Sequence, residues 1–249
     1  MKTHKREILT KKRSEDIQKF ISRVGFKMHE INSIKESNMN ISLINEALTH
    51  KSANFYFNYE ILEFLGDAVL RLAASEYIEE NFCELNVGDR SALRSHIVSD
   101  EWLASVGSQM GIKEVIVIGP KVINDKTAMK TIDAESLEAL IGAIYKSLKD
   151  INVIKEWLKK YWEVTSKEFL SDPDKFNSKS ALQEWSQSQG MEKPNYYIKE
   201  VSKKHGDPQR FFCEVRIENK ILGKGWGKSR KNAEKEAAKT ALEKQKIAK

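Results

Sequence analysis

The sequence predicts an all-α domain followed by a small α+β domain of element order α-β-β-β-α. From about residue 14 to residue 169, apolar residues recur at spacings of three and four, which is typical of amphipathic helices. Residues 170–176, LSDPDKF, lack that periodicity and indicate a linker. From 177 to 246, a helical pattern, three strand-like patterns and a second helical pattern follow one another.

The helical part is predicted from its apolar spacing and its helix-breaking residues. Its first helix carries an apolar face, formed by Ile17, Phe20, Ile21 and Val24. The pair Gly88-Asp89 indicates a break and an N-cap before one helix that runs through Trp102. Residues 114–120, EVIVIGP, are rich in β-branched residues but short, so we expect a connector there. Helical spacing resumes in 135–149 and in 154–169.

The C-terminal part is predicted to fold as a small α+β domain. A short helix, SALQEWSQSQG, ends at Gly190. Three strands follow in NYYIKEV, RFFCEVRIE and KILGKGW, and we expect a tight hairpin turn at Asn219-Lys220. The last helix carries a stripe of small residues that lets it lie close to a sheet: Ala233, Ala237, Ala238, Ala241 and Leu242.

Size and composition indicate a globular protein with room for two domains. The chain has 249 residues, of which 40% are hydrophobic and 31% charged. No apolar run approaches the ~20 residues that a membrane span requires, so we expect no membrane association. The basic N-terminus lacks an apolar core and does not predict a secretory signal. The two cysteines, Cys83 and Cys213, lie far apart and form no metal-ligand spacing, which favours a reducing cytoplasm.

The net charge of +6 is unevenly distributed along the chain. Residues 177–249 hold 17 Lys and Arg against 9 Asp and Glu, whereas residues 14–176 hold 19 against 26. A basic end joined to an acidic body suggests that the end holds a polyanion while the body does something else. Chance drift of charge along the sequence is the plainer alternative.

The stretch YEILEFLGDAVL, residues 59–70, places carboxylates in an otherwise apolar helical run. At about 100° per residue, Glu63 lies about 300° and Asp67 about 340° from Glu60, so the three share a narrow stripe. Buried carboxylates need counter-charges, and a hard divalent cation such as Mg²⁺ is a natural one. Gly66 costs about 1 kcal/mol in a helix and suggests close approach of another backbone, for example across a dimer interface.

A second carboxylate pair lies in the stretch DAESLEALIGAIY. Glu135 and Glu138 are about 300° apart around the helix, on nearly one face, whereas Asp133 lies about 200° from Glu135. Two helices that each present carboxylates from an apolar background could close a metal site between them. The alternative is that these acids are ordinary exposed residues of amphipathic helices, and for Glu135 and Glu138 taken alone that alternative is the better one.

The C-terminal domain, with its α-β-β-β-α order, resembles the double-stranded-RNA-binding domain. The resemblance implies recognition of A-form shape across two minor grooves and the phosphates between them. It implies minor-groove contacts by Gln183 and Glu184 and by the 205–209 loop with His205. The loop departs from the usual Gly-Pro-x-His pattern. The phosphate-holding residues implied by the resemblance are Lys228, Arg230 and Lys231. For the basic helix face alone, a solvated surface stripe is the alternative.

Five segments together resemble bacterial ribonuclease III, over about residues 15–246. Besides the RNA-binding domain and residues 59–70, they are ALTHKS (47–52), GDRSALR (88–94) and LEALIGAIY (137–145). The resemblance implies an α-helical endonuclease domain at 14–169 that acts as a homodimer, and a double-stranded-RNA-binding domain at 177–246. It implies cytoplasmic processing of rRNA and mRNA precursors.

The same resemblance implies the site residues. Asp67 and Glu138 match catalytic metal-site carboxylates, Glu63 matches a further ligand, and Glu60 matches the acidic cluster. Glu135 stands where Asp is usual, so its coordination could be direct or through water. Val87 stands where a further acid is usual. The implied cofactor is Mg²⁺, for which Mn²⁺ could substitute.

The implied reaction is hydrolysis of double-stranded RNA to 5′-phosphate and 3′-hydroxyl ends, driven by a metal-activated water. His50 is then interpreted as a packing or RNA-contacting residue rather than a general base. The rival hypothesis is a duplex-RNA-binding assembly factor whose nuclease fold is silent, which Glu135 and Val87 favour and the other acids oppose. A nuclease of duplex DNA is a third hypothesis, opposed by the RNA-reading domain.

Overall fold

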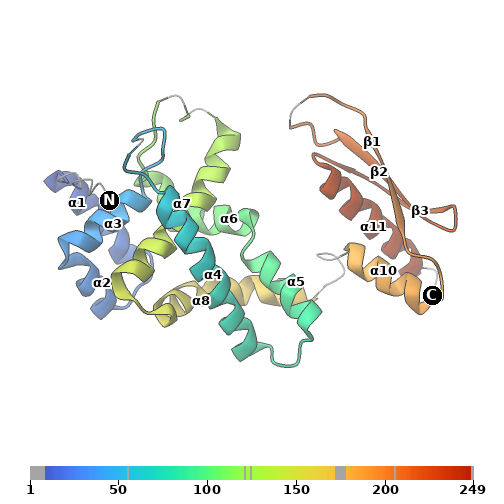
Figure 1. Cartoon of the computed structure of the whole chain (residues 1–249), viewed down its shortest axis with the longest axis horizontal. Coiled ribbons are helices and arrows are strands. Elements are labelled where there is room, and N and C mark those ends of the chain that lie inside the picture. Colours follow the sequence, from blue (N-terminus) through green and yellow to red (C-terminus); the bar gives the residue numbers. More distant parts are fainter. Residues whose placement is uncertain are drawn as a thin grey trace. The chain divides into compact units, whose positions relative to one another are not determined.

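The computed structural model describes residues 9–54, 56–120, 122–123, 125–171, 178–204 and 206–247. By its internal contacts the chain separates into two compact units, Met1–Ser166 and Lys167–Lys249. The first is helical, and the second contains a three-stranded sheet with a helix before and after it (Figure 1). The predicted fold class is therefore confirmed.

The first part of the chain is a succession of helices. In order they are α1 (Lys11–Arg23), α2 (Met28–Lys35), α3 (Asn38–Ala47), α4 (Glu60–Asn81), α5 (Val87–Ile97), α6 (Asp100–Met110), the 3₁₀ turn η1 (Ile112–Glu114), α7 (Lys126–Leu148) and α8 (Ile151–Ser171). The predicted connector at 114–120 is confirmed, and it holds one parallel bridge between Thr49 and Val117.

The predicted single helix from Asp89 through Trp102 is wrong. The Asn86 side chain, not Asp89, caps α5 by accepting the Asp89 N–H at 3.0 Å. α5 ends at Ile97, and Ser99 caps a separate helix α6 by accepting the Trp102 N–H at 3.3 Å. A serine whose hydroxyl can replace a backbone acceptor stops one helix and starts the next, and apolar spacing alone does not reveal such a break.

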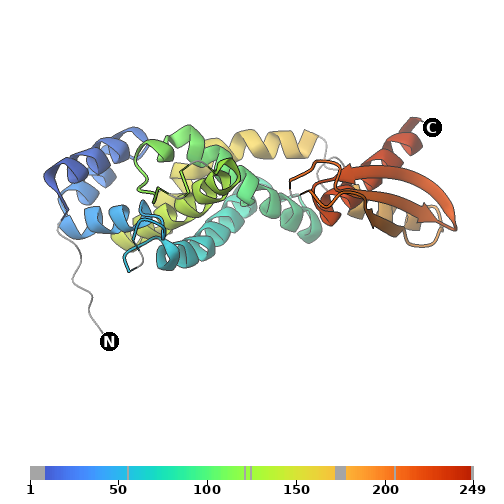
Figure 2. The same cartoon turned by 90° about the horizontal axis from the view of Figure 1, so that it is seen from above.

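Helices α4 and α7 form the centre of the helical unit and lie side by side (Figures 1 and 2). Their buried residues are large and aliphatic, among them Leu62 and Leu70 on α4 and Leu137 and Leu140 on α7. α3 and α6 also pack on α7. The two helices predicted to carry carboxylates are thus direct neighbours.

The apolar run of α4 predicts a helix that is buried on every side except the stripe of acids. This prediction is wrong. Leu62, Val69 and Ala73 are buried, but a second apolar stripe faces outward. That stripe, called the α4 outer stripe below, consists of Ile61, Phe64, Leu65, Ala68 and Leu72, and its Phe64 is 84% exposed. The acids lie along one border between the two faces.

The predicted linker begins later than expected. α8 continues to Ser171, so the first two residues of 170–176 are helical, and residues 172–176 lie outside the described residues. The domain boundaries at 169 and 177 themselves stay a prediction. None of the helices in the described part of the chain combines the length and apolar character that a membrane span requires.

The second unit consists of α10 (Ser178–Ser188), three strands and α11 (Arg230–Ile247). The strands β1 (Asn195–Glu200), β2 (Phe211–Ile217) and β3 (Lys220–Gly227) form an antiparallel sheet in the order β1-β2-β3. Alternate residues of β2 are buried, so one face of the sheet packs on the helices. The predicted stripe Ala233, Ala237, Ala238, Ala241 and Leu242 is buried in this core.

Three glycines of β3 let α11 lie against the sheet. A Cβ added at Gly223 or at Gly225 would lie 2.2 Å from backbone atoms of Ala237, and one at Gly227 would lie 2.5 Å from the Ala233 nitrogen. The predicted hairpin turn is one residue off: Glu218 and Asn219 have positive φ of 48° and 65°, and β3 already begins at Lys220. Two consecutive positive φ angles are typical of the type I′ hairpin turn.

Candidate active site

The carboxylate-bearing faces of α4 and α7 meet where two glycines remove side chains from the contact. A Cβ on Gly66 would lie 1.8 Å from the carbonyl oxygen of Glu138, and a Cβ on Gly142 would lie 2.2 Å from that of Leu62. The close approach expected at Gly66 is therefore present, but its partner is α7 of the same chain. Gly142 was not assigned a role from the sequence, and a glycine in an apolar helical run was the signal for it.

This crossing brings Glu63 and Asp67 of α4 near Glu135 and Glu138 of α7. Burial, followed by the charge of Glu135, raises the pKa of Glu63 to about 7. Burial, followed by the charges of Asp67 and Glu63, raises the pKa of Glu138 to about 7. Each raised pKa has carboxylates of the other helix among its causes, so the four acids share one electrostatic environment with too little positive charge.

Three of the predicted site residues are engaged by neighbouring side chains. Asp67 Oδ1 accepts a hydrogen bond from Arg71 Nε at 2.8 Å. Glu60 pairs with Lys51 at 3.1 Å, and both side chains are more than half exposed. Glu135 accepts a short hydrogen bond from the hydroxyl of Tyr59, whose ring is fully buried. Arg71, Lys51 and Tyr59 are partners that the sequence reasoning did not assign.

Among the described residues, no three His, Cys, Asp or Glu side chains converge closely enough to hold a metal ion as they stand. The donor set nevertheless fits a hard divalent cation, because it consists of carboxylate oxygens on two adjacent helices. Burial and the neighbouring carboxylates raise the pKa of Glu63 and of Glu138 to about 7, so a cation placed among these acids would favour their ionised forms. These residues therefore suit Mg²⁺, provided that the side chains now paired elsewhere turn toward it.

Two further residues of the sequence analysis have structural partners. His50 Nδ1 accepts the Ser52 N–H at 3.0 Å, so the ring carries its proton on Nε2. Ser52 Oγ in turn accepts the Gly119 N–H at 2.9 Å. Burial lowers the pKa of His50, in keeping with a packed ring. Asp133 is buried and pairs with Lys113 at 3.1 Å, away from Glu135 as its helical angle predicts.

The second unit presents the predicted RNA-contacting residues on its surface. Gln183 and Glu184 are exposed on α10, and Lys228, Arg230 and Lys231 are exposed at the start of α11. No acidic side chain within the described ranges pairs with these three cations, whereas Lys224 pairs with Glu214 and Lys239 lies near Glu236 and Glu243. The start of α11 therefore presents three cations without an acidic partner in the described part of the chain, at a helix end whose dipole also attracts anions. His205 lies outside the described residues.

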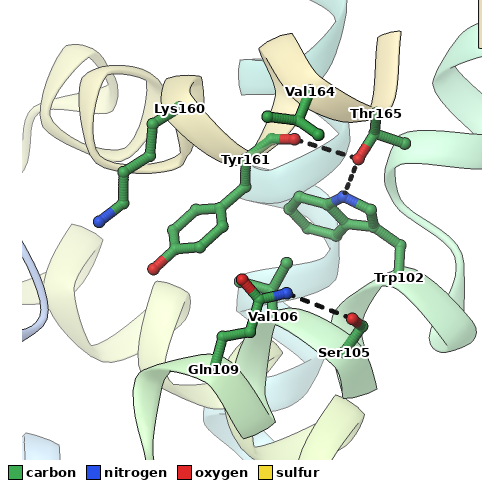
Figure 3. A pocket seen from close by; sticks show the side chains of 8 residues that line it. All are labelled: Trp102, Ser105, Val106, Gln109, Lys160, Tyr161, Val164 and Thr165. Atoms are coloured by element: carbon green, nitrogen blue, oxygen red, sulfur yellow. Dashed lines mark hydrogen bonds between the residues drawn. The ribbon is translucent and has the colours of Figure 1, made fainter. Parts of the chain in front are cut away.

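A pocket of about 430 Å³ lies between α6 and α8, apart from the carboxylates (Figure 3). Trp102 forms part of its wall, and its indole N–H donates to Thr165 Oγ1 at 3.0 Å. Lys160 lies over the ring of Tyr161, with its Nζ 4.7 Å from the ring centroid. Its lining contains no acid or histidine, so it offers no group for hydrolysis.

A helical unit with carboxylates on two crossing helices, followed by a basic α-β-β-β-α unit, defines the class of nucleases that process structured RNA. Residues 40–163 match the family model described as Ribonuclease-III-like, and residues 178–245 match the double-stranded RNA binding motif. The chain is 54% identical to ribonuclease 3 of Prochlorococcus marinus, over 95% of this chain and 96% of that protein. It is 38% identical to a ribonuclease 3 of Nostoc sp., over 80% and 83%. The chain therefore belongs to the ribonuclease III family of endoribonucleases and ends in a double-stranded-RNA-binding domain.

A solved structure is also similar. The nuclease domain of ribonuclease III from Campylobacter jejuni is 29% identical and covers 61% of this chain and 96% of its own, with a TM-score of 0.49.

Proposed function

We propose that the chain cleaves double-stranded RNA by Mg²⁺-dependent hydrolysis and leaves 5′-phosphate and 3′-hydroxyl ends. Glu63, Asp67, Glu135 and Glu138 would hold the metal, with Asp67 and Glu138 as the catalytic pair and Glu60 at the edge of the cluster. The observation that carries this proposal is the close crossing of α4 and α7 at Gly66 and Glu138, which brings the acids of the two helices together. The pKa values of Glu63 and Glu138, which are raised first by burial and then by neighbouring acids, support it. Mn²⁺ would substitute, because it accepts the same oxygen ligands.

The bound metal would supply a water of lowered pKa and compensate charge on the scissile phosphate. The chain's own residues supply the rest. The Gly66–Glu138 contact fixes the separation of the two helices, so the carboxylates of α4 and α7 stay aligned during the reaction. Tyr59 restrains Glu135 by its hydroxyl hydrogen bond. We expect no covalent enzyme intermediate, because a metal-activated water would be the nucleophile.

Substrate capture is proposed for the second unit. Lys228, Arg230 and Lys231 would hold phosphates, and Gln183 and Glu184 would meet a minor groove, with His205 in the adjoining loop. The assignment is supported by the exposure of the residues other than His205. It is also supported by the three cations at the start of α11, which have no acidic partner among the described residues. Phosphate contacts give affinity without base specificity, which suits a protein that reads duplex shape.

Assembly as a homodimer is proposed through the α4 outer stripe. Ile61, Phe64 and Leu72 are each more than half exposed, and exposed apolar stripes of this kind mark protein interfaces. Two symmetry-related active sites would then cut both strands of one duplex. We also propose a cytoplasmic location and a role in rRNA and mRNA precursor processing. The cytoplasmic location is supported by two cysteines that are both free.

The variant Glu138→Gln separates cleavage from binding. With long double-stranded RNA and Mg²⁺, we expect Glu138→Gln to bind with wild-type affinity in a gel shift but to cleave at least ~100-fold more slowly, because the isosteric amide cannot supply a metal-binding charge. Glu79→Gln changes an exposed glutamate of α4 and is the matched control. Undiminished cleavage by Glu138→Gln contradicts the site. A wild-type protein that binds but never cleaves with Mg²⁺ or Mn²⁺ would instead be the silent assembly factor.

A further inference from the structure

Arg71 lies on α4 one turn after Asp67 and contacts its carboxylate. The Arg71 Nε donates to Asp67 Oδ1 at 2.8 Å, and the two side chains are 56% and 41% exposed. The pair is therefore formed at the surface of the cluster, where both solvent and a metal ion can reach it. The proposed ligand Asp67 is thus bound to a cation of its own helix.

The Arg71–Asp67 pair lies next to the crossing of α4 and α7, unlike an ordinary salt bridge on an isolated helix. Asp67 directly follows Gly66, whose backbone touches Glu138, so Arg71 stands next to the crossing of α4 and α7. Arg71 is also the cation that lowers the pKa of Glu138, against the raising effects of burial, Asp67 and Glu63. It therefore compensates acids of both helices, although it is bonded to one of them.

We propose that Arg71 is an internal counter-ion of the active site, which competes with the metal for Asp67 and sets the metal concentration that the enzyme needs. This inference rests on the proposed metal site. When the metal binds, the Arg71 side chain has to leave Asp67 and turn to solvent, which its exposure allows.

The expected size of the effect follows from the exposure of the pair. An exposed ion pair contributes little, so removal of Arg71 should tighten metal binding by about two- to fivefold rather than by orders of magnitude. The comparison pair is Arg23 with Glu114, which lie 2.6 Å apart and are 50% and 64% exposed on α1 and η1. It has the same chemistry and similar exposure but does not involve the carboxylate cluster.

The test measures binding of Mn²⁺ to the full-length protein without RNA, by titration with detection of free Mn²⁺ by electron paramagnetic resonance. Arg71→Gln should lower the Kd by about two- to fivefold relative to wild type, and Arg23→Gln should leave it unchanged. Arg71→Lys keeps the charge and should return the Kd toward the wild-type value. In cleavage assays, Arg71→Gln should reach half-maximal rate at a correspondingly lower Mg²⁺ concentration.

The outcomes test the counter-ion role of Arg71 separately from the metal site itself. Equal Kd values for Arg71→Gln and Arg23→Gln would overturn the counter-ion role, and so would an Arg71→Lys variant that binds as tightly as Arg71→Gln. Glu138→Gln is measured in parallel and should weaken Mn²⁺ binding. If it does not, the metal site itself is wrong. If it does and Arg71→Gln changes nothing, the metal site stands and the role of Arg71 falls.

Discussion

The backbone of Gly66 lies against the carbonyl oxygen of Glu138, with no room for a β-carbon between them. This contact joins the two helices that carry the proposed metal ligands at the level of those ligands. Because Gly142 makes the reciprocal contact with Leu62, the crossing is held at two points about one helical turn apart. Backbone packing therefore sets the spacing of the helical positions that carry the carboxylates, whereas the side chains themselves can still turn.

Gly66→Ala should destabilise the helical unit although alanine is the better helix former. The added methyl would lie 1.8 Å from a backbone oxygen, so the helices must separate. Overpacking costs about 1–3 kcal/mol, and a clash of 1.8 Å with backbone places this variant at the upper end, above the ~1 kcal/mol that alanine gains in helix propensity. For a domain of this size the melting temperature should fall by roughly 2–6 °C, measured by calorimetry.

A matched control is Gly88→Ala, at the start of α5. Its added methyl would meet the Asn86 side chain at 3.1 Å, and that side chain can move. The melting temperature of this variant should stay the same or rise, because alanine is the better helix former. A Gly66→Ala protein with unchanged stability and unchanged cleavage would show that the close contact is dispensable.

The metal-free protein should lose stability as the pH rises from about 4.5 to about 7. Glu63 and Glu138 have folded-state pKa values of about 7 against an ordinary value of 4.5, so in this range the unfolded chain has released protons that the folded chain keeps. The free energy of unfolding therefore falls with rising pH and levels off above about pH 7. Mg²⁺ should restore stability, and most strongly above pH 7.

Thermal melts of wild type and Glu138→Gln between pH 5 and 8 test whether stability falls with rising pH. The variant lacks one of the two titrating groups, so its melting temperature should depend less on pH than that of wild type. Parallel curves for the two proteins would contradict the raised pKa of Glu138. A stabilising effect of Mg²⁺ that is independent of pH would contradict competition between protons and metal.

The effect of a substitution at Tyr59 on cleavage should depend on the residue at position 135. The Tyr59 hydroxyl reaches Glu135, whereas an aspartate at that position would be one methylene too short to accept the same bond. We therefore expect Glu135→Asp to preserve or raise cleavage, because the carboxylate is released toward the metal. Tyr59→Phe should alter cleavage in wild type and cost about 1 kcal/mol of stability, but should change cleavage little in the Glu135→Asp background.

A double-mutant cycle of cleavage rates measures this dependence. Additive effects of Tyr59→Phe and Glu135→Asp would show that the hydrogen bond has no part in activity. Indifference of the enzyme to Asp, Gln and Ala at position 135 would place Glu135 outside the metal's surroundings altogether.

Phe64→Glu should convert the proposed homodimer to a monomer. Phe64 is 84% exposed within the single chain, so a charge there does not disturb the packing of that chain but would be buried in the proposed interface. Light scattering after size exclusion should show half the wild-type mass, with an unchanged circular dichroism spectrum. Met28→Glu, on α2 at 70% exposure, is the control and should keep the wild-type mass. A wild-type protein that is already monomeric at micromolar concentration would contradict the dimer.

The sequence predicted the fold class and which acids share a face of each helix, because helical periodicity and angle arithmetic depend on local geometry. It placed Glu135 and Glu138 on one face and Asp133 elsewhere, and the structure pairs Asp133 with Lys113 accordingly. The stripe of small residues on α11 was predicted for the same reason.

What the sequence could not predict depends on contacts between distant segments. The partner of Gly66 is Glu138, more than 70 residues away, and Tyr59 reaches Glu135 over 76 positions. The break before α6 depends on one serine hydroxyl. The sequence did not reveal that one side of α4 is exposed. Apolar residues of a protein interface have the same helical spacing as apolar residues of a core.

The alternation of glycine along β3 restricts how the RNA-binding unit can assemble. Gly223, Gly225 and Gly227 face α11, so a slip of one residue would push the side chains of Lys224 and Trp226 under the helix. Misaligned strands cannot close this unit, and folding should select a single register. The start of α11, where the proposed phosphate-binding residues lie, should therefore keep one position relative to the sheet whether or not RNA is bound.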